Sequence, residues 1–153
     1  MTLDVSEIYA QVLSHAKRLG LFQRVLTHEP KSAPVGGLTC AIWASSYKPV
    51  DAVSGLDSTS MRLELLGRIY AEGKAQPEDA IDPRVLDATS KLIDSFTGDI
   101  QLGGVSPLGI DLLGAYGDSL SARWGFIWID DKQYRVADLV IPLIIPDIYE
   151  HND

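Results

Sequence analysis

Residues 124–145 of this 153-residue chain read WGFIWIDDKQYRVADLVIPLII, and this stretch decides the fold. Two apolar runs, from Trp124 to Ile129 and from Tyr134 to Ile145, lie on either side of the polar segment 130–133. Apolar runs of strand length that are separated by a short polar segment are typical of a β-hairpin. We therefore expect two neighbouring antiparallel strands in the last third of the sequence.

The pairing of these two strands determines which side chains share a face. If 130–133 is the turn, Ile129 pairs with Tyr134, and Trp128 becomes a cross-strand neighbour of Arg135, within reach of a cation–π contact. Both faces of the hairpin are then apolar, so both need cover, from a partner subunit or from a loop folded over the sheet. One face holds Ile127, Ile129, Tyr134, Val136 and Val140; the other holds Trp124, Phe126, Trp128, Arg135, Ala137, Leu139 and Ile141.

Two segments carry the period of amphipathic helices. The first has Asp4 in position to cap its start and Gly20 in position to end it. The second begins at Asp82-Pro83, a capping residue followed by the residue favoured at the first helical position, and ends at Gly98. The apolar face of this second helix is expected to hold Val85, Leu86, Thr89, Leu92, Ile93 and Phe96.

Three further strands are predicted before the hairpin, at Phe22–Thr27, Leu38–Tyr47 and Arg62–Ala71. In the second of them, Ala41, Trp43 and Tyr47 are expected on one face. The segment Lys48–Ser60 has no period and predicts an exposed, mobile loop. Together these elements predict one α+β domain over residues 1–153, with a small, mostly antiparallel β-sheet and two α-helices packed on one face.

The composition argues against several classes of protein. The net charge of −8 and the pI of about 4.7 oppose binding to a phosphate backbone, which needs a basic patch. The single cysteine, Cys40, excludes an internal disulfide and suits assembly in the cytosol. No stretch approaches the roughly 20 apolar residues of a membrane span, and the first residues lack the pattern of a secretion signal.

A search for catalytic chemistry finds no convincing set of residues. His15, His28 and His151 have no second ligand at metal-binding spacing, and we expect them to be packed or on the surface. The glycine-rich segment 99–121, in which 110–114 is a candidate short strand, lacks the Gly-Lys-Ser/Thr ending of a phosphate loop. We therefore assign no catalytic, cofactor-binding or metal-binding residue.

Three carboxylates, Asp111, Asp118 and Asp138, are candidates for acid–base work in principle. The hairpin pairing places Asp138 on an otherwise aliphatic face, where a carboxylate needs a partner. Arg135 or Arg68 can supply that partner, which favours a structural ion pair.

Five short segments of the C-terminal part, taken in order, resemble a known family. They are 110–117 (IDLLGAYG), 120–122 (LSA), 124–126 (WGF), 134–136 (YRV) and 140–144 (VIPLI). In this order and at this chain length they resemble the tail terminator proteins of long-tailed bacteriophages, similar to those of lambda-like phages. Over residues 1–100 the resemblance is only in the order of helices and strands.

The resemblance implies a structural protein of the virion that is not an enzyme and needs no cofactor. It implies a homo-oligomeric, hexameric ring, assembled in the host cytoplasm, that caps the tail tube, ends tail polymerisation and joins the tail to the head connector. DNA then passes through the lumen without specific binding. A head–tail joining or tail completion protein is the nearest alternative, and a small dimeric α+β ligand-binding or enzymatic domain built on Asp138, Arg68 and Tyr70 is the alternative of another class.

Two regions are predicted to contact other chains. The first is the aromatic face of the hairpin around Trp124, Trp128 and Arg135, because Trp and Arg are enriched at the centres of interfaces. The second is the loop Lys48–Ser60, which includes Asp57 and is expected to order when it docks on the tail tube.

Overall fold

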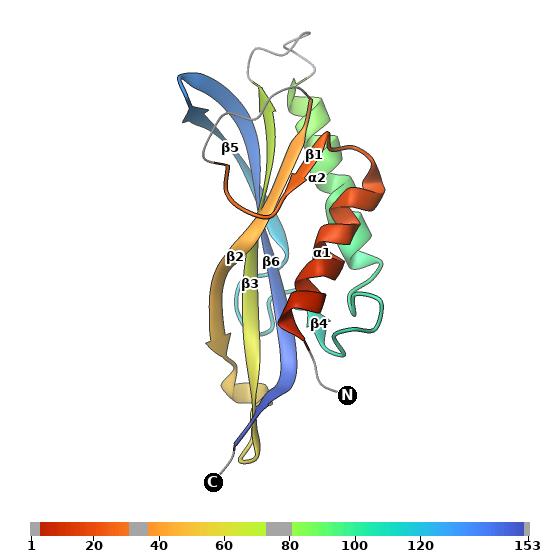
Figure 1. Ribbon diagram of the computed structural model, residues 1–153, viewed down its shortest axis with the longest axis vertical. Helices are drawn as coiled ribbons and strands as arrows, with labels where there is room; N and C mark the ends of the chain where they lie inside the picture. The colour runs from red at the N-terminus through yellow and green to blue at the C-terminus, as the bar shows by residue number, and fades with distance from the viewer. Residues whose placement is uncertain (1–3, 31–36, 73–80, 152–153) are drawn as a thin grey trace.

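The computed structural model describes residues 4–30, 37–72 and 81–151. The described helices and strands are mixed along the chain (Figure 1). One helix comes first, the second helix follows three strands, and the longest strand comes last. They are α1 (Val5–Leu19), β1 (Arg24–Leu26), β2 (Thr39–Pro49), the 3₁₀ turn η1 (Asp51–Val53), β3 (Ser58–Glu72), α2 (Ile81–Thr97), β4 (Gly109–Ile110), β5 (Ser121–Ile129) and β6 (Lys132–Glu150).

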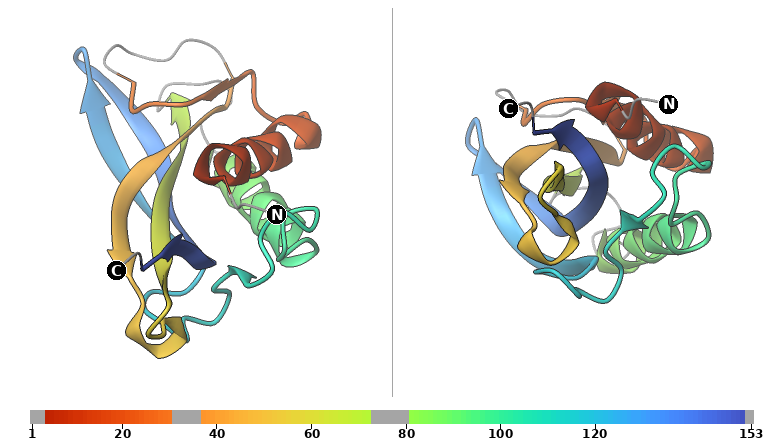
Figure 2. Two further views of the ribbon diagram at one scale, coloured as in Figure 1. Left: turned by 60° about the horizontal axis from the view of Figure 1, so that its bottom comes forward. Right: turned by 90° about the horizontal axis from the view of Figure 1, so that it is seen from below.

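The strands form one mostly antiparallel sheet, in the order β1-β2-β3-β6-β4, with β5 also paired to β6. Among the strands that the structure describes, only β1 and β2 run parallel. The sheet is strongly curled, and α1 and α2 lie together along one outer side of it (Figure 2). The predicted fold class is therefore confirmed: an α+β fold with two helices on one face of the sheet.

The main core lies between the two helices and the sheet. Its helix side comes from the predicted apolar faces, and its sheet side comes from alternate residues of β2, β3 and β6. Leu86 does not belong to it, because its side chain is 55% exposed on the outer face of α2, contrary to our prediction. The fully buried members include Ile8, Val12, Cys40, Ile42, Leu65, Ile69, Val85, Leu92, Phe96, Leu102, Ala137, Leu139, Ile141, Leu143 and Ile145.

Part of the opposite face of the sheet is covered by the sheet itself. Leu26 on β1 and Ile129 on β5, from strands at opposite edges, pack against one small cluster on this face. The buried centre of that cluster includes Tyr70 and Tyr134, whose rings meet edge to face at 6.3 Å. Curling thus provides part of the second cover, which the sequence led us to expect from a partner subunit or a loop.

The predicted pairing of the β5–β6 hairpin is wrong by two residues. Ile129 pairs with Lys132 and Ile127 with Tyr134, so the turn consists of Asp130 and Asp131 alone. Both turn residues have positive φ, 49° and 63°, the geometry of the tight turns that match the twist of a hairpin. Because a shift of two residues preserves the alternation, the predicted faces remain correct.

A β-bulge in β2 changes the predicted position of Tyr47. Ala44 pairs with Leu65 but Ser46 pairs with Glu64, so Ser45 is an extra residue on β2. Tyr47 is therefore shifted to the helix side of the sheet, whereas Ala41 and Trp43 lie on the opposite face.

β6 is 19 residues long and passes through Pro142 without interruption. The carbonyl of Pro142 accepts from the Asp111 N–H. On this side of β6, the pairing with β5 ends at Val140 and the pairing with β4 begins at Leu143. The N–H that proline lacks would point into this gap between two partner strands, so no ladder bond is lost. The strand predicted at 110–114 is reduced to Gly109–Ile110.

The helix ends are largely as predicted. Asp4 caps α1, since its side chain accepts from the Ser6 N–H at 2.9 Å, and Gly20 follows the helix with φ +67°. α2 spans Ile81–Thr97, so Asp82 and Pro83 lie inside its first turn and not at its cap.

Candidate functional site

A row of exposed aromatic side chains runs along β5, which we call the aromatic ridge and define as Trp124, Phe126 and Trp128. They are 43%, 57% and 68% exposed. Their cross-strand partners on β6 place them on the same sheet face as the helices, but beyond the helices' cover. Large exposed apolar patches usually mark interaction surfaces.

Arg135 adds a positive charge to this ridge. Its guanidinium lies 4.6 Å from the centre of the Phe126 ring, and it donates to the Gly125 carbonyl at 3.3 Å. Phe126 is its direct cross-strand neighbour, and Gln133 stands opposite Trp128. The predicted cation–π contact between Arg135 and Trp128 is therefore wrong, although Trp124, Trp128 and Arg135 do share one surface.

The second predicted contact region, Lys48–Ser60, is not a loop throughout. β2 continues to Pro49, η1 follows, and β3 begins at Ser58, so this region is the tip of a β-hairpin. The tip is tied to the end of β6: His151 donates its backbone N–H to the Asp57 carbonyl at 2.7 Å. Leu56 is 96% exposed, and Asp57 beside it is also exposed.

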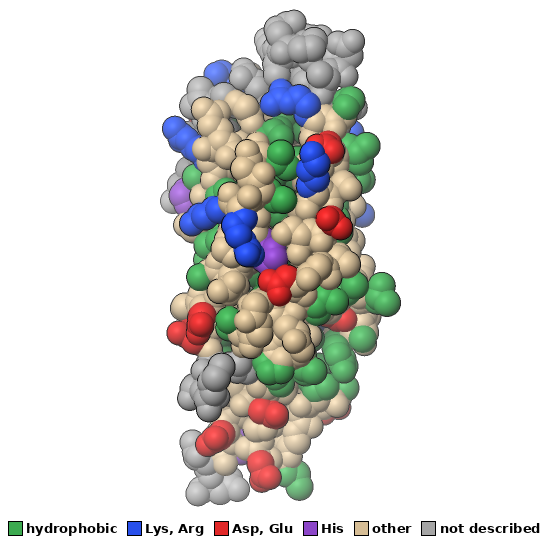
Figure 3. Space-filling model, turned by 90° about the vertical axis from the view of Figure 1, so that its right-hand side faces the viewer, with side chains coloured by type: hydrophobic (Ala, Val, Ile, Leu, Met, Phe, Trp, Pro, Cys, Tyr) green, Lys and Arg blue, Asp and Glu red, His purple; other side chains and the backbone are tan. Residues whose placement is uncertain are grey.

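Charge is distributed unevenly along the long axis. On the face with the helices, Lys and Arg side chains gather in the upper half and the lower half is acidic (Figure 3). Four exposed acids, Asp51, Asp57, Asp147 and Glu150, belong to the hairpin tip and the end of β6. The two ends of the molecule therefore present different surfaces to a partner.

A groove of about 630 Å³ opens on the face opposite the helices. Its floor includes Arg68 on β3 and Asp138 on β6, which are cross-strand neighbours joined by a hydrogen-bonded ion pair at 2.5 Å. Arg68 also lies 3.5 Å from Glu29 and 5.8 Å from the ring centres of Trp43 and Tyr70. The predicted partner for Asp138 is confirmed as Arg68, and the pair braces two strands.

The other two candidate carboxylates lie in different surroundings. Asp111 accepts from the backbone N–H groups of Ala115 and Tyr116, at 2.7 and 2.9 Å, and so holds a turn. The carbonyl of Asp118 accepts from Arg62. Asp118 lines the same groove as Asp138, whereas Asp111 does not.

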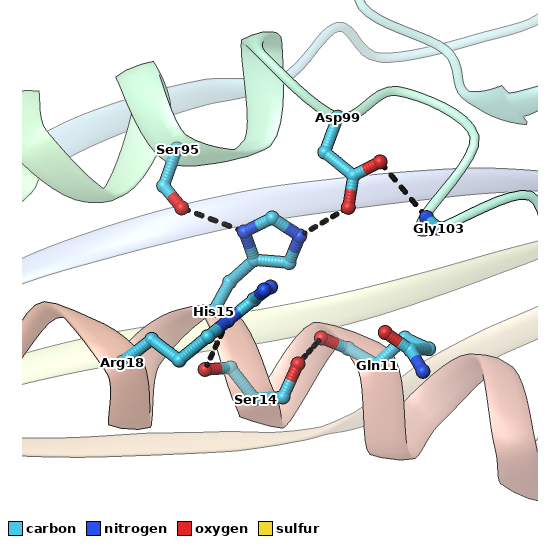
Figure 4. Close-up of polar contacts among 7 residues, drawn as sticks. All are labelled: Gln11, Ser14, His15, Arg18, Ser95, Asp99 and Gly103. Carbon is cyan, nitrogen blue, oxygen red and sulfur yellow. Dashed lines mark hydrogen bonds and ion pairs between the residues drawn. The ribbon is translucent and has the colours of Figure 1, made fainter.

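His15 forms a cluster that the sequence did not reveal (Figure 4). Its Nδ1 is 2.6 Å from the Ser95 hydroxyl on α2, and its Nε2 is 2.9 Å from the Asp99 carboxylate. Asp99 accepts in turn from the Gly103 N–H, and this bond, with the His15 side chain, lowers the pKa of Asp99. His15 is only 3% exposed and packs on Phe96, so the cluster joins α1 to the end of α2 and leaves little access for a substrate.

Cys40 is buried in the core, and burial raises the pKa of its thiol to about 12. In residues 4–30, 37–72 and 81–151, no group of three or more His, Cys, Asp or Glu side chains is arranged to hold a metal ion. Within the same ranges, none of the helices is both long and apolar enough to cross a bilayer.

Comparisons with known proteins connect this geometry to one solved structure. The chain is similar to the sheath/tube terminator of PVC, an extracellular contractile injection system, in its extended state, with a TM-score of 0.53 and 9% sequence identity. The match covers 100% of this chain and 58% of that one, so the chain spans somewhat over half the length of the terminator. No protein-family profile and no curated protein sequence matches the chain. The likeness shows a terminator-like fold.

Proposed function

We propose that this protein is a structural subunit of a phage tail: a tail terminator that forms a hexameric ring on the end of the tail tube. The ring stops further polymerisation of the tube protein and presents a surface to the head connector. It acts without catalysis or a cofactor, is assembled in the host cytoplasm and remains in the virion. The observation that carries the proposal is the likeness to a sheath/tube terminator over the whole chain.

The aromatic ridge supports assembly with further copies. A ring is built from contacts between two different surfaces of each subunit. The ridge supplies one such surface, because exposed Trp side chains next to an Arg are typical of the residues that dominate binding energy. Replacing Trp128 with Ala is expected to weaken assembly, and an intact oligomer from this variant would place the contact elsewhere.

The hairpin tip supports contact with the tail tube. The turn that leads into β3, which carries Leu56 and Asp57, lies at one end of the molecule (Figure 1), and the end of β6 braces it. Shortening the tip by removal of Gly55–Asp57 is expected to leave the oligomer intact and to reduce capping of tail tubes. Unchanged capping by the shortened protein would exclude the tip as the tube contact.

The acidic balance of the chain supports free passage of DNA. A net charge of −8 repels the phosphate backbone, so a ring of such subunits does not grip the duplex. Neutralising acids that face the lumen is expected to strengthen DNA binding in a mobility-shift assay. Unchanged DNA affinity in these variants would argue against an electrostatic role for the lumen.

The deciding experiment is the native mass by light scattering over a range of protein concentration, followed by capping of tubes that lack their terminator. A closed hexamer, or a monomer–hexamer equilibrium, together with arrest of tube growth, is the expected result. A ring that binds the head side of the neck and leaves tube growth unchanged would identify a head–tail joining protein instead.

The groove on the other face is the observation that favours a second candidate, a small dimeric ligand-binding or enzymatic domain. Its volume suits a small molecule. Two arginines, Arg68 and Arg123, line the groove, and Arg68 is already hydrogen-bonded to Asp138, which reduces its capacity for a ligand. A persistent dimer with a ligand-dependent rise in Tm would support this candidate.

A further inference from the structure

The two edges of the sheet carry complementary features on the same face. The aromatic ridge lies at the β5 edge. Near the other edge, a pocket of about 290 Å³ opens between α1 and the sheet. The strand register places two of its lining residues, Ala44 and Leu65, on the same face of the sheet as the aromatic ridge. The pocket is lined by Val5, Ser6, Tyr9, Thr27, Ala44, Leu63 and Leu65, so its wall is mostly apolar. We call it the α1–β2 pocket.

We propose that the aromatic ridge of one copy docks on the α1–β2 pocket of the next copy, with an indole side chain inserted in the pocket. This inference rests on the proposed ring and names the contact that closes it. The contact is head-to-tail: each copy offers its ridge to one neighbour and its pocket to the other. Contacts of this kind close into a ring when the rotation between copies allows it.

The sizes of the two features agree. A cavity of about 150 Å³ lined by apolar side chains accommodates benzene, so a pocket of about 290 Å³ has room for an indole. An aromatic side chain buries about 150–250 Å² when fully covered, so the exposed part of the ridge amounts to roughly 300–400 Å². This is a substantial part of the ~800 Å² that each side of a stable interface buries.

The charges of the two features are opposite. The ridge carries the guanidinium of Arg135 over Phe126, on the same face of the sheet as the three aromatic side chains. The pocket lies at the first turn of α1, where Val5 and Ser6 line it and the exposed acids Asp4 and Glu7 flank them in sequence. A cationic ridge that approaches an anionic rim has the complementarity that selects a partner and its orientation.

The backbone of both edges is also suited to this contact. β5 pairs with β6 alone in the described part of the chain, and it contains no proline and no bulge against β6. Edge strands that do not bind other chains usually carry a proline or a bulge, because an open edge is a template for pairing with another strand. β1 covers only Thr39–Ala41 of β2, so the rest of β2, which borders the pocket at Ala44, has no described strand on its outer side.

Paired variants test each half of the contact by native mass. Ala44→Glu puts a charge into the pocket, and Ser45→Glu puts the same charge on the neighbouring exposed bulge residue. Trp124→Ala/Trp128→Ala removes both indole side chains of the ridge, and Leu86→Ala/Leu108→Ala removes two exposed apolar side chains elsewhere. We expect at least a tenfold rise in the concentration needed for assembly for Ala44→Glu and the Trp pair, and none for the two controls.

A photo-crosslinking aromatic amino acid at Phe126 identifies what the ridge touches, since it preserves the aromatic character of that position. It is applied to the full chain, in solution and on tail tubes, with the same residue at Leu86 as the control. We expect a covalent dimer whose link joins Phe126 to segments 4–9 or 42–49 of the second copy, and no dimer from the control.

The outcomes separate this inference from the proposed function. A ring that caps tail tubes but links Phe126 to β5 of a second copy, or that tolerates Ala44→Glu, overturns the ridge-to-pocket contact and leaves the terminator proposal standing. A chain that neither assembles nor caps tubes overturns both. Loss of capping in all four variants, controls included, also contradicts the proposed contact, because its effect must be specific to ridge and pocket.

Discussion

Arg68 and Asp138 stand directly opposite each other on β3 and β6, and the guanidinium of one is hydrogen-bonded to the carboxylate of the other. The side chains are 20% and 39% exposed, so solvent screens the pair only in part. We expect a double-mutant cycle with Arg68→Met and Asp138→Asn to give a coupling free energy of about 1 kcal/mol, measured by urea denaturation.

The matched control for this cycle is the Lys91–Asp87 pair on α2, whose side chains are 53% and 58% exposed at a contact distance of 2.8 Å. Exposed i,i+4 pairs are worth about 0.3–0.5 kcal/mol. Equal coupling in the two cycles would show that the position of Arg68 and Asp138 in the groove adds nothing to their interaction.

Gly109 is expected to tolerate no side chain. It has φ +59°, and an added Cβ would lie 1.9 Å from the Ile100 carbonyl oxygen. Gly104 also has positive φ, +85°, but an added Cβ there meets nothing within 4 Å. We expect Gly104→Ala to cost about 1 kcal/mol from backbone strain alone, and Gly109→Ala to cost several times more or to abolish folding. Similar unfolding midpoints for the two variants would contradict this reading of the glycine-rich segment.

Asp99 is expected to make the protein acid-sensitive. The Gly103 N–H and then His15 hold the pKa of Asp99 below its ordinary value. A carboxylate whose pKa is lower in the folded state adds stability above its unfolded pKa, near 4, and this stability is lost as pH falls through the folded pKa. The Tm of Asp99→Asn should therefore fall less steeply than that of the wild type below about pH 4. Parallel Tm curves for the two proteins would exclude this role of Asp99.

Cys40 is expected to be chemically silent in the folded protein. Its thiol is buried and its pKa is about 12, so almost no thiolate is present at pH 8. A thiol-reactive chromogenic reagent should react with it only after unfolding in urea. Rapid reaction in native buffer would show that the core around Cys40 opens readily.

The parts of the fold that could be predicted from the sequence are those specified by neighbouring residues. The Asp4 cap, the Gly20 stop and the alternation of β3 each depend on residues a few positions apart. The two faces of the C-terminal hairpin were also correct. Its pairing was not, because two acidic residues in left-handed conformation make a tighter turn than the four polar residues suggested.

The parts that could not be predicted depend on contacts between distant residues. A single extra residue, Ser45, turns the side chain of Tyr47 to the other face, and no local pattern marks it. The His15 cluster joins residues 80 and 84 positions apart in sequence. Curling of the sheet lets β1 and β5 share one cluster, which alternation in a single strand does not indicate.

The length of β6 has a mechanical consequence. Its 19 residues, at about 3.3 Å each, make a strand roughly 60 Å in contour that reaches from the β5 hairpin to the tip region. β3 is paired antiparallel along most of it. A pulling force applied between the two ends of the molecule acts along these strands, so it shears many ladder bonds simultaneously and does not unzip them in succession. A subunit of this design is expected to be stiff along its long axis and to resist extension in that direction far better than peeling from its edges.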